Sequence, residues 1–115
     1  MNQLTRIDLD NNQLSKLEKP LLKDLNQLVW FNISGNQVKH IDPEFFFELT
    51  QLSQICLNGN ELTQLDSNLF KGLIKLQYIN LHFNQLESLS DDIFNGLYSL
   101  NRIDLSKNQL VTLGR

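Results

Sequence analysis

The apolar residues of this chain recur every 24 positions. In each unit a leucine is followed three residues later by isoleucine or phenylalanine, which begins a short alternation of apolar and non-apolar residues. The equally spaced positions form columns: Leu4, Leu28, Leu52, Leu76 and Leu100; Ile7, Phe31, Ile55, Ile79 and Ile103; Leu9, Ile33, Leu57, Leu81 and Leu105; and Asn12, Asn36, Asn60, Asn84 and Asn108. A period in this range is typical of a solenoid, in which one small unit is stacked along an axis.

Each alternation predicts a short strand with one buried face. Stretches such as Ile7–Leu9 and Ile55–Leu57 place apolar side chains two residues apart, which is the period of a β-strand. Because the copies run in the same direction, we expect the strands to pair in parallel, one per coil. The asparagine column follows the strands where the chain turns, and its stacked amides are expected to form a ladder of hydrogen bonds with buried turn backbone.

The polar return segments carry further apolar columns: Leu21, Phe45, Leu69 and Ile93; Leu22, Phe46, Phe70 and Phe94; and Leu25, Leu49, Leu73 and Leu97. Phe46, Phe70 and Phe94 stand one coil apart, so they predict a phenylalanine spine behind the sheet. The segments are too short for a long helix, and turns or single helical turns are expected there.

The whole chain, residues 1–115, is therefore expected to be a single array. Its repeats cover residues 4–27, 28–51, 52–75 and 76–99, and a partial repeat covers residues 100–115. One coil buries too little apolar surface to fold alone, so stacked neighbours have to supply the rest of the stabilisation.

Aligned by period, the units read L-x-x-[IF]-x-[LI]-x-x-N-x-[LV]-x-x-[LI]. The chain resembles leucine-rich repeat proteins of the 24-residue "typical" subtype, whose pattern adds a phenylalanine in the return segment. The stretches Leu52–Lys75 and Leu76–Ser99 match every defining position of that pattern. The resemblance extends from Leu4 to Leu113, and the first repeat departs from it by having Leu22 in place of the phenylalanine.

This resemblance implies an α/β solenoid, mostly β with short turns or single-turn helices, bent into a right-handed horseshoe with a parallel sheet on its concave side. It also implies a role in recognising proteins. The subtype is most common in receptor ectodomains, matrix proteoglycans and adhesion proteins, which implies an extracellular or cell-surface location. Those proteins carry cysteine-rich caps at both ends of the array. This chain has neither, so we expect it to be a fragment of a longer protein.

The outward-facing strand residues predict a partner-binding surface on the concave face. Trp30 and Tyr78 fall in one column whose two ends are Arg6 and Arg102, and this composition is typical of an interface hot spot. The alternative is that the aromatic side chains only cover the sheet. The expected partner-binding residues are Arg6, Trp30, Asn32, Gln54, Tyr78, Asn80, His82, Phe83 and Arg102.

Composition narrows the function further. The net charge of −3 gives no electrostatic reason to expect nucleic acid or an anionic membrane as a partner. No apolar run approaches the roughly 20 residues of a membrane span. Cys56 is the only cysteine, which suits either a reducing compartment or one piece of a secreted protein. The alternatives are therefore a cytoplasmic leucine-rich repeat scaffold or regulatory subunit, and an array with no function of its own.

Catalysis and metal binding have little support in the sequence. Cys56, His82 and Asp104 step diagonally across three adjacent expected strands, which makes a cysteine hydrolase a remote alternative. An open sheet, however, offers no enclosed pocket for such chemistry. No cluster of cysteine and histidine has the spacing of metal ligands, so neither metal nor cofactor is expected. The sequon Asn32-Ile33-Ser34 is weak support for secretion, and the sequence does not indicate an oligomeric state.

Overall fold

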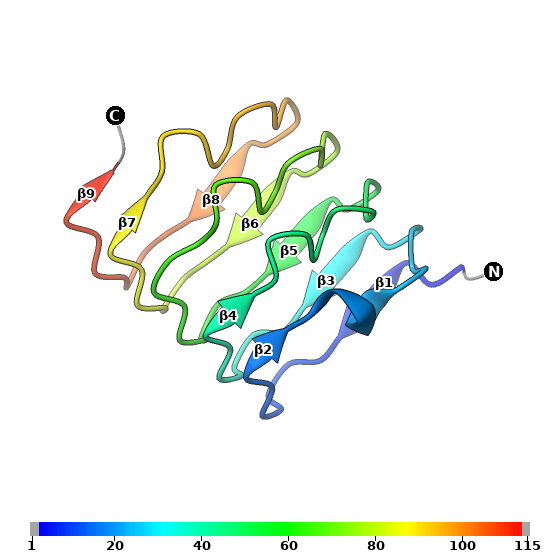
Figure 1. The fold of residues 1–115 in the computed structure, drawn as a ribbon, viewed down its shortest axis with the longest axis horizontal. Coiled ribbons are helices and arrows are strands. Elements are labelled where there is room, and N and C mark those ends of the chain that lie inside the picture. The colour runs from blue at the N-terminus through cyan, green and yellow to red at the C-terminus, as the bar shows by residue number, and fades with distance from the viewer. Residues whose placement is uncertain (1–2, 114–115) are drawn as a thin grey trace.

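A computed structural model describes residues 3–113 of the chain, and each 24-residue unit forms one coil of a solenoid (Figure 1). The ends of the expected array, residues 1–2 and 114–115, lie outside the described residues. Within the described part, one face of the solenoid is a five-stranded parallel sheet, as the period predicts. Its strands, in spatial order, are β1 (Arg6–Asp8), β3 (Trp30–Asn32), β5 (Gln54–Cys56), β6 (Tyr78–Asn80) and β8 (Arg102–Asp104).

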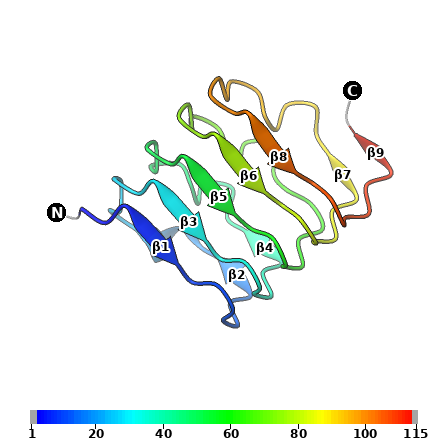
Figure 2. The ribbon, with the colours of Figure 1, turned by 180° about the vertical axis from the view of Figure 1, so that it is seen from behind.

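A second layer of very short strands lies behind this main sheet (Figure 2). Strand β2 (Lys16–Leu17) pairs in parallel with β4 (His40–Ile41), and β7 (Ser88–Leu89) pairs with β9 (Thr112–Leu113). The residue pattern does not predict these pairs. The return segments are otherwise turns, apart from a 3₁₀-helix, η1 (Lys19–Leu22), so the expectation of turns or single helical turns is confirmed.

The core lies between the main sheet and the return segments. The strand columns supply fully buried side chains, among them Leu28, Phe31, Ile33, Leu52, Ile55, Leu57, Leu76, Ile79 and Leu81. Two positions of the apolar columns are exposed and do not belong to the core. Leu4 is 49% exposed, and Leu21 is 46% exposed, whereas Phe45, Leu69 and Ile93 in the column of Leu21 are buried. Leu21 lies in η1 at the outer coil, where packing neighbours are present on one side only.

Phenylalanine side chains stack along the solenoid behind the sheet. The ring centroids of Phe46 and Phe70 are 6.1 Å apart, and so are those of Phe70 and Phe94, with interplanar angles of 22° and 14°. Phe31 and Phe45 pack against Phe46 at 5.7 and 5.0 Å. In the first coil Leu22 occupies this position, and a groove of about 390 Å³ lies beside it.

The asparagine column joins each coil to its neighbours. The Asn60 amide nitrogen donates to the carbonyls of Leu57 and Ile33, both at 3.1 Å, and its oxygen accepts the Val38 backbone N–H at 3.0 Å. Asn36, Asn84 and Asn108 make the corresponding bonds one coil apart. These amides therefore satisfy turn backbone that would otherwise be buried without partners. Asn12, in the first coil, donates only to carbonyls of its own coil, those of Leu9 and Asp10.

Candidate functional site

Five of the nine residues expected to face a partner form one row across the main sheet. The strand register aligns Arg6 with Trp30, Trp30 with Gln54, Gln54 with Tyr78, and Tyr78 with Arg102. The two arginines are exposed, and the three side chains between them are half-buried. The core residues on either side of this row point the other way, since side chains alternate along a strand.

Each aromatic side chain of the row is covered by the arginine of the outer strand beside it. The guanidinium carbon of Arg6 lies 4.4 Å from the Trp30 ring centroid, and that of Arg102 lies 5.0 Å from the Tyr78 ring centroid. Both distances are within the range of a cation–π contact. Burial raises the pKa of the Tyr78 hydroxyl, partly opposed by Arg102, so this hydroxyl keeps its proton at neutral pH and can donate.

The Asp8 carboxylate accepts hydrogen bonds from the side chains at the β1 end of the row. Its Oδ2 accepts a hydrogen bond from Nε of Arg6 at 2.7 Å, and its Oδ1 accepts from Nε1 of Trp30 at 3.0 Å and Nδ2 of Asn32 at 3.2 Å. The bond from Arg6, followed by that from Trp30, holds the pKa of the Asp8 carboxyl below its usual range. The Asn32 oxygen accepts the backbone N–H of Ser34 at 2.9 Å. Trp30 is therefore held in one orientation by its neighbours.

A second network lies at the β8 end. Asp104 Oδ1 accepts from Oγ of Ser106 at 2.6 Å and from the Ser106 backbone N–H at 3.0 Å, and these bonds lower the pKa of the Asp104 carboxyl. The Ser106 hydroxyl is 2.7 Å from Nδ1 of His82. Asn80 accepts the backbone N–H of His82 at 2.9 Å. His82 is thus tied to Asp104 through a serine that the sequence analysis did not single out.

This arrangement does not assemble the cysteine relay considered from the sequence. Cys56 is buried, and that burial raises the pKa of its thiol, which disfavours the nucleophilic thiolate. Within residues 3–113, no hydrogen bond joins Cys56 to His82, whose Nδ1 faces Ser106 instead. Among those same residues, no three side chains of His, Cys, Asp or Glu are grouped to hold a metal ion.

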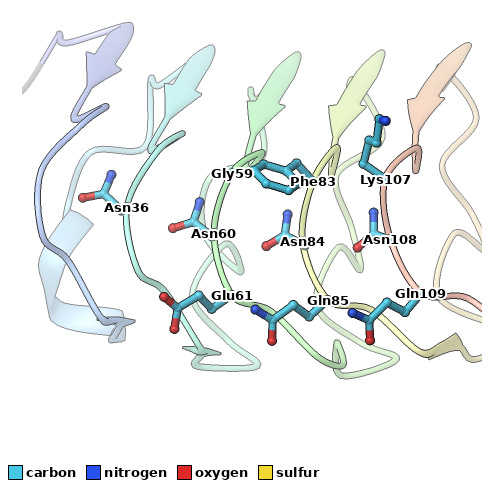
Figure 3. A pocket seen from close by; sticks show the side chains of 10 residues that line it. All are labelled: Asn36, Gly59, Asn60, Glu61, Phe83, Asn84, Gln85, Lys107, Asn108 and Gln109. Carbon is cyan, nitrogen blue, oxygen red and sulfur yellow. The ribbon is translucent and has the colours of Figure 1, made fainter.

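Phe83 lies beyond the sheet, on the turn that follows β6. The residue is 65% exposed, and the centroid of its ring is 6.2 Å from that of His82. It lines a groove of about 490 Å³ that crosses the coils beside the asparagine ladder (Figure 3). Lys107, Gln85 and Gln109 line the same groove and were missed in the sequence analysis. The signal for Lys107 is that larger residues at positions 83 and 107 replace the glycines of positions 35 and 59. Gln85 and Gln109 continue a polar column that begins with Gln13 and Gln37, so nothing distinguishes them in the sequence.

A family model described as leucine-rich repeat matches residues 2–62 and 50–110. One similar solved structure is that of the Toll–Spatzle complex, a molecular hub in Drosophila development and innate immunity; the match has a TM-score of 0.90 and 27% identity, and covers 93% of this chain and 14% of that one. Another is the leucine-rich repeat domain of APL1B, with a TM-score of 0.92, 22% identity, and coverage of 96% and 32%. This chain therefore spans less than two thirds of either relative. No curated protein matches it.

Proposed function

This chain belongs to the leucine-rich repeat family of protein-interaction modules, and from that premise we propose that it binds a protein partner through the concave face of its main sheet. The observation that carries the proposal is the row in which Trp30 and Tyr78 are each covered by an arginine. Tryptophan, tyrosine and arginine are the residues most enriched in interface hot spots. In this proposal the chain acts by binding, without catalysis.

Rigidity of the row supports the proposal. Asp8 holds Arg6, Trp30 and Asn32 together before any partner arrives, so little side-chain entropy remains to be lost on binding. At the other end, Arg102 makes its contact with the Tyr78 ring and, within the described part of the chain, no salt bridge with a carboxylate. Its guanidinium N–H groups can therefore donate to an acceptor on the partner.

We also propose that this single repeat array is part of a secreted protein or a receptor ectodomain. The similarity to a chain in the Toll–Spatzle complex supports this proposal. No helix within residues 3–113 is long and apolar enough to cross a membrane. A glycan on Asn32 would have to displace the bonds of its amide to Asp8 and Ser34, and it would cover the proposed surface. Mass spectrometry of the secreted chain should therefore find Asn32 unmodified.

The test compares concave and convex aromatic residues. The immobilised chain is exposed in parallel to extracellular fluid and to a cytosolic extract, and retained proteins are quantified for the unmodified chain, for Trp30→Ala and for Tyr78→Ala. Tyr98→Ala is the matched control, because Tyr98 is 88% exposed and lies in a return segment, away from the main sheet. A genuine partner is one whose purified form binds the unmodified chain and loses roughly tenfold or more in affinity with either concave variant.

The outcomes separate clearly. Loss with Trp30→Ala and Tyr78→Ala, but not with Tyr98→Ala, supports binding through the concave face. Binding that is unchanged by both concave variants, while their melting temperatures match that of the unmodified chain, would refute it. If the only partners that bind the purified chain are cytosolic proteins, the intracellular scaffold replaces the extracellular proposal.

A further inference from the structure

One residue in each coil takes up a left-handed backbone conformation just before the ladder asparagine. These residues are Asn11, Gly35, Gly59, Phe83 and Lys107, with φ between 58° and 71°. The N–H of Gly59 donates to the carbonyl of His82 in the next coil at 2.9 Å, and that of Phe83 donates to Ser106 at 2.9 Å. The bond between coils thus accompanies the left-handed turn, so the fold imposes this conformation at position 83 as well.

Phenylalanine is an unfavourable residue for such a position. A bulky side chain in the left-handed region is strained, whereas glycine is not. Burial does little to offset the strain at Phe83, because the residue is 65% exposed. A strained backbone that displays an exposed aromatic ring points to a contact made with another molecule.

The groove beside Phe83 shows what that contact would be. Lys107 follows Phe83 one coil further along, and no carboxylate within residues 3–113 pairs with it. Glu61, on the opposite wall, is already paired with Lys39 at 3.7 Å. Figure 3 shows the Phe83 ring lying towards Gly59, which has no side chain, with the Lys107 side chain on the other side of Phe83. An aromatic ring and an unpaired cation are therefore presented together.

We propose that the groove lined by Phe83, Gln85, Lys107 and Gln109, called the rim groove below, binds a polypeptide segment of the partner. In this segment an apolar side chain is followed by a carboxylate. The apolar side chain packs on the Phe83 ring, and the carboxylate pairs with Lys107. The inference rests on the proposed function, because the groove continues the concave surface through His82, whose ring is 6.2 Å from that of Phe83. It adds a second contact region and an acidic requirement that the sheet row does not supply.

The test uses two dipeptide probes and needs no knowledge of the partner. Acetyl-Leu-Glu-amide and acetyl-Leu-Gln-amide are titrated to millimolar concentration into the isotopically labelled chain, and amide chemical shifts are followed by NMR. The shifts are expected at Phe83, Gln85 and Lys107, and the glutamate probe should bind about two- to fivefold more tightly than the glutamine probe. Lys107→Gln should abolish that difference. Shifts located elsewhere, equal binding of the two probes, or no binding would overturn the proposal.

Phe83→Gly separates a binding residue from a packing residue. It relieves the strain and removes the ring, so the variant is expected to melt at a higher temperature than the unmodified chain and to lose the probe-induced shifts. A lower melting temperature would show that Phe83 serves the fold and would overturn the inference. Trp30→Ala should leave the probe shifts unchanged. The proposal for the rim groove and the proposal for the concave row can therefore be refuted independently of each other.

Discussion

The asparagine ladder allows the cost of one buried amide to be worked out bond by bond. In Asn60→Ala, the carbonyl of Ile33 keeps the amide of Asn36, and the carbonyl of Leu57 keeps the amide of Asn84. The backbone N–H of Val38 has no such substitute, because the Asn60 oxygen is its acceptor. The carbonyl of Asn58 also loses the Asn60 amide and keeps the N–H of Gly35. The substitution therefore leaves one buried donor fully without a partner and three carbonyls with one partner each.

One stranded buried donor costs about 1–3 kcal/mol of unfolding free energy. In a chain of this size, 1 kcal/mol corresponds to about 4 °C, so the melting temperature should fall by about 4–12 °C. The measurement is urea denaturation followed by circular dichroism, with thermal melting alongside. The dependence of the unfolding free energy on urea should stay unchanged, because the variant exposes the same surface on unfolding.

Asn12→Ala is the matched control, since Asn12 is exposed and bonds only within its own coil. Its loss should be about 0.5 kcal/mol or less, as for exposed substitutions in general. Equal losses in Asn12→Ala and Asn60→Ala would refute the reasoning, because they would show that the bonds between coils contribute nothing of their own.

Three further predictions concern other parts of the structure. Phe70→Ala, at a fully buried ring stacked on both sides, should cost about 3–5 kcal/mol in urea denaturation, and a loss below about 1 kcal/mol would contradict a structural spine. The fluorescence of Trp30, the single tryptophan, should change as acid protonates Asp8. The pKa of Asp8 in the folded chain lies below its ordinary value of 3.8. The hydrogen bonds to Asp8 are therefore intact above pH 3.8 and are lost as the pH falls through the folded pKa. Asp8→Asn should remove this change in fluorescence. Cys56, buried and with its thiol pKa raised above 9.0, should react slowly with an alkylating reagent at neutral pH and quickly once urea unfolds the chain; fast reaction in the folded chain would contradict its burial.

The main sheet could be predicted from the sequence because its signal repeats. Each strand carries the same alternation at the same phase, so Ile55 and Ile79 pair in the structure as their spacing requires. Strands β2, β4, β7 and β9 escaped prediction because two residues are too few to show an alternation. The exposure of Leu21 could not be predicted, because it depends on the helix η1 and on the position of Leu21 in the outer coil. The 24-residue period gives information about neither.

The candidate site was predictable in composition and not in detail. The column containing Trp30 and Tyr78 follows from the register, but the hydrogen bonds of Asp8 depend on side-chain positions across two strands. Cys56 has an outward position between the core residues Ile55 and Leu57, and it is nevertheless buried, because it is a small side chain on the central strand with longer neighbours on both sides. The rim groove depends on the shape of the turns, which a residue pattern does not specify.

The phenylalanine spine also has a consequence for curvature. Its rings are spaced 6.1 Å apart, whereas paired strands lie about 4.8 Å apart. The stacked rings are therefore about 1.3 Å further apart than paired strands, and this difference favours bending of the solenoid around its main sheet. The rings thus favour curvature of the face that is proposed to bind a partner. Where Leu22 replaces the ring, this contribution is smaller, so the array should be straighter at its first coil than between the coils that contain Phe46 and Phe94.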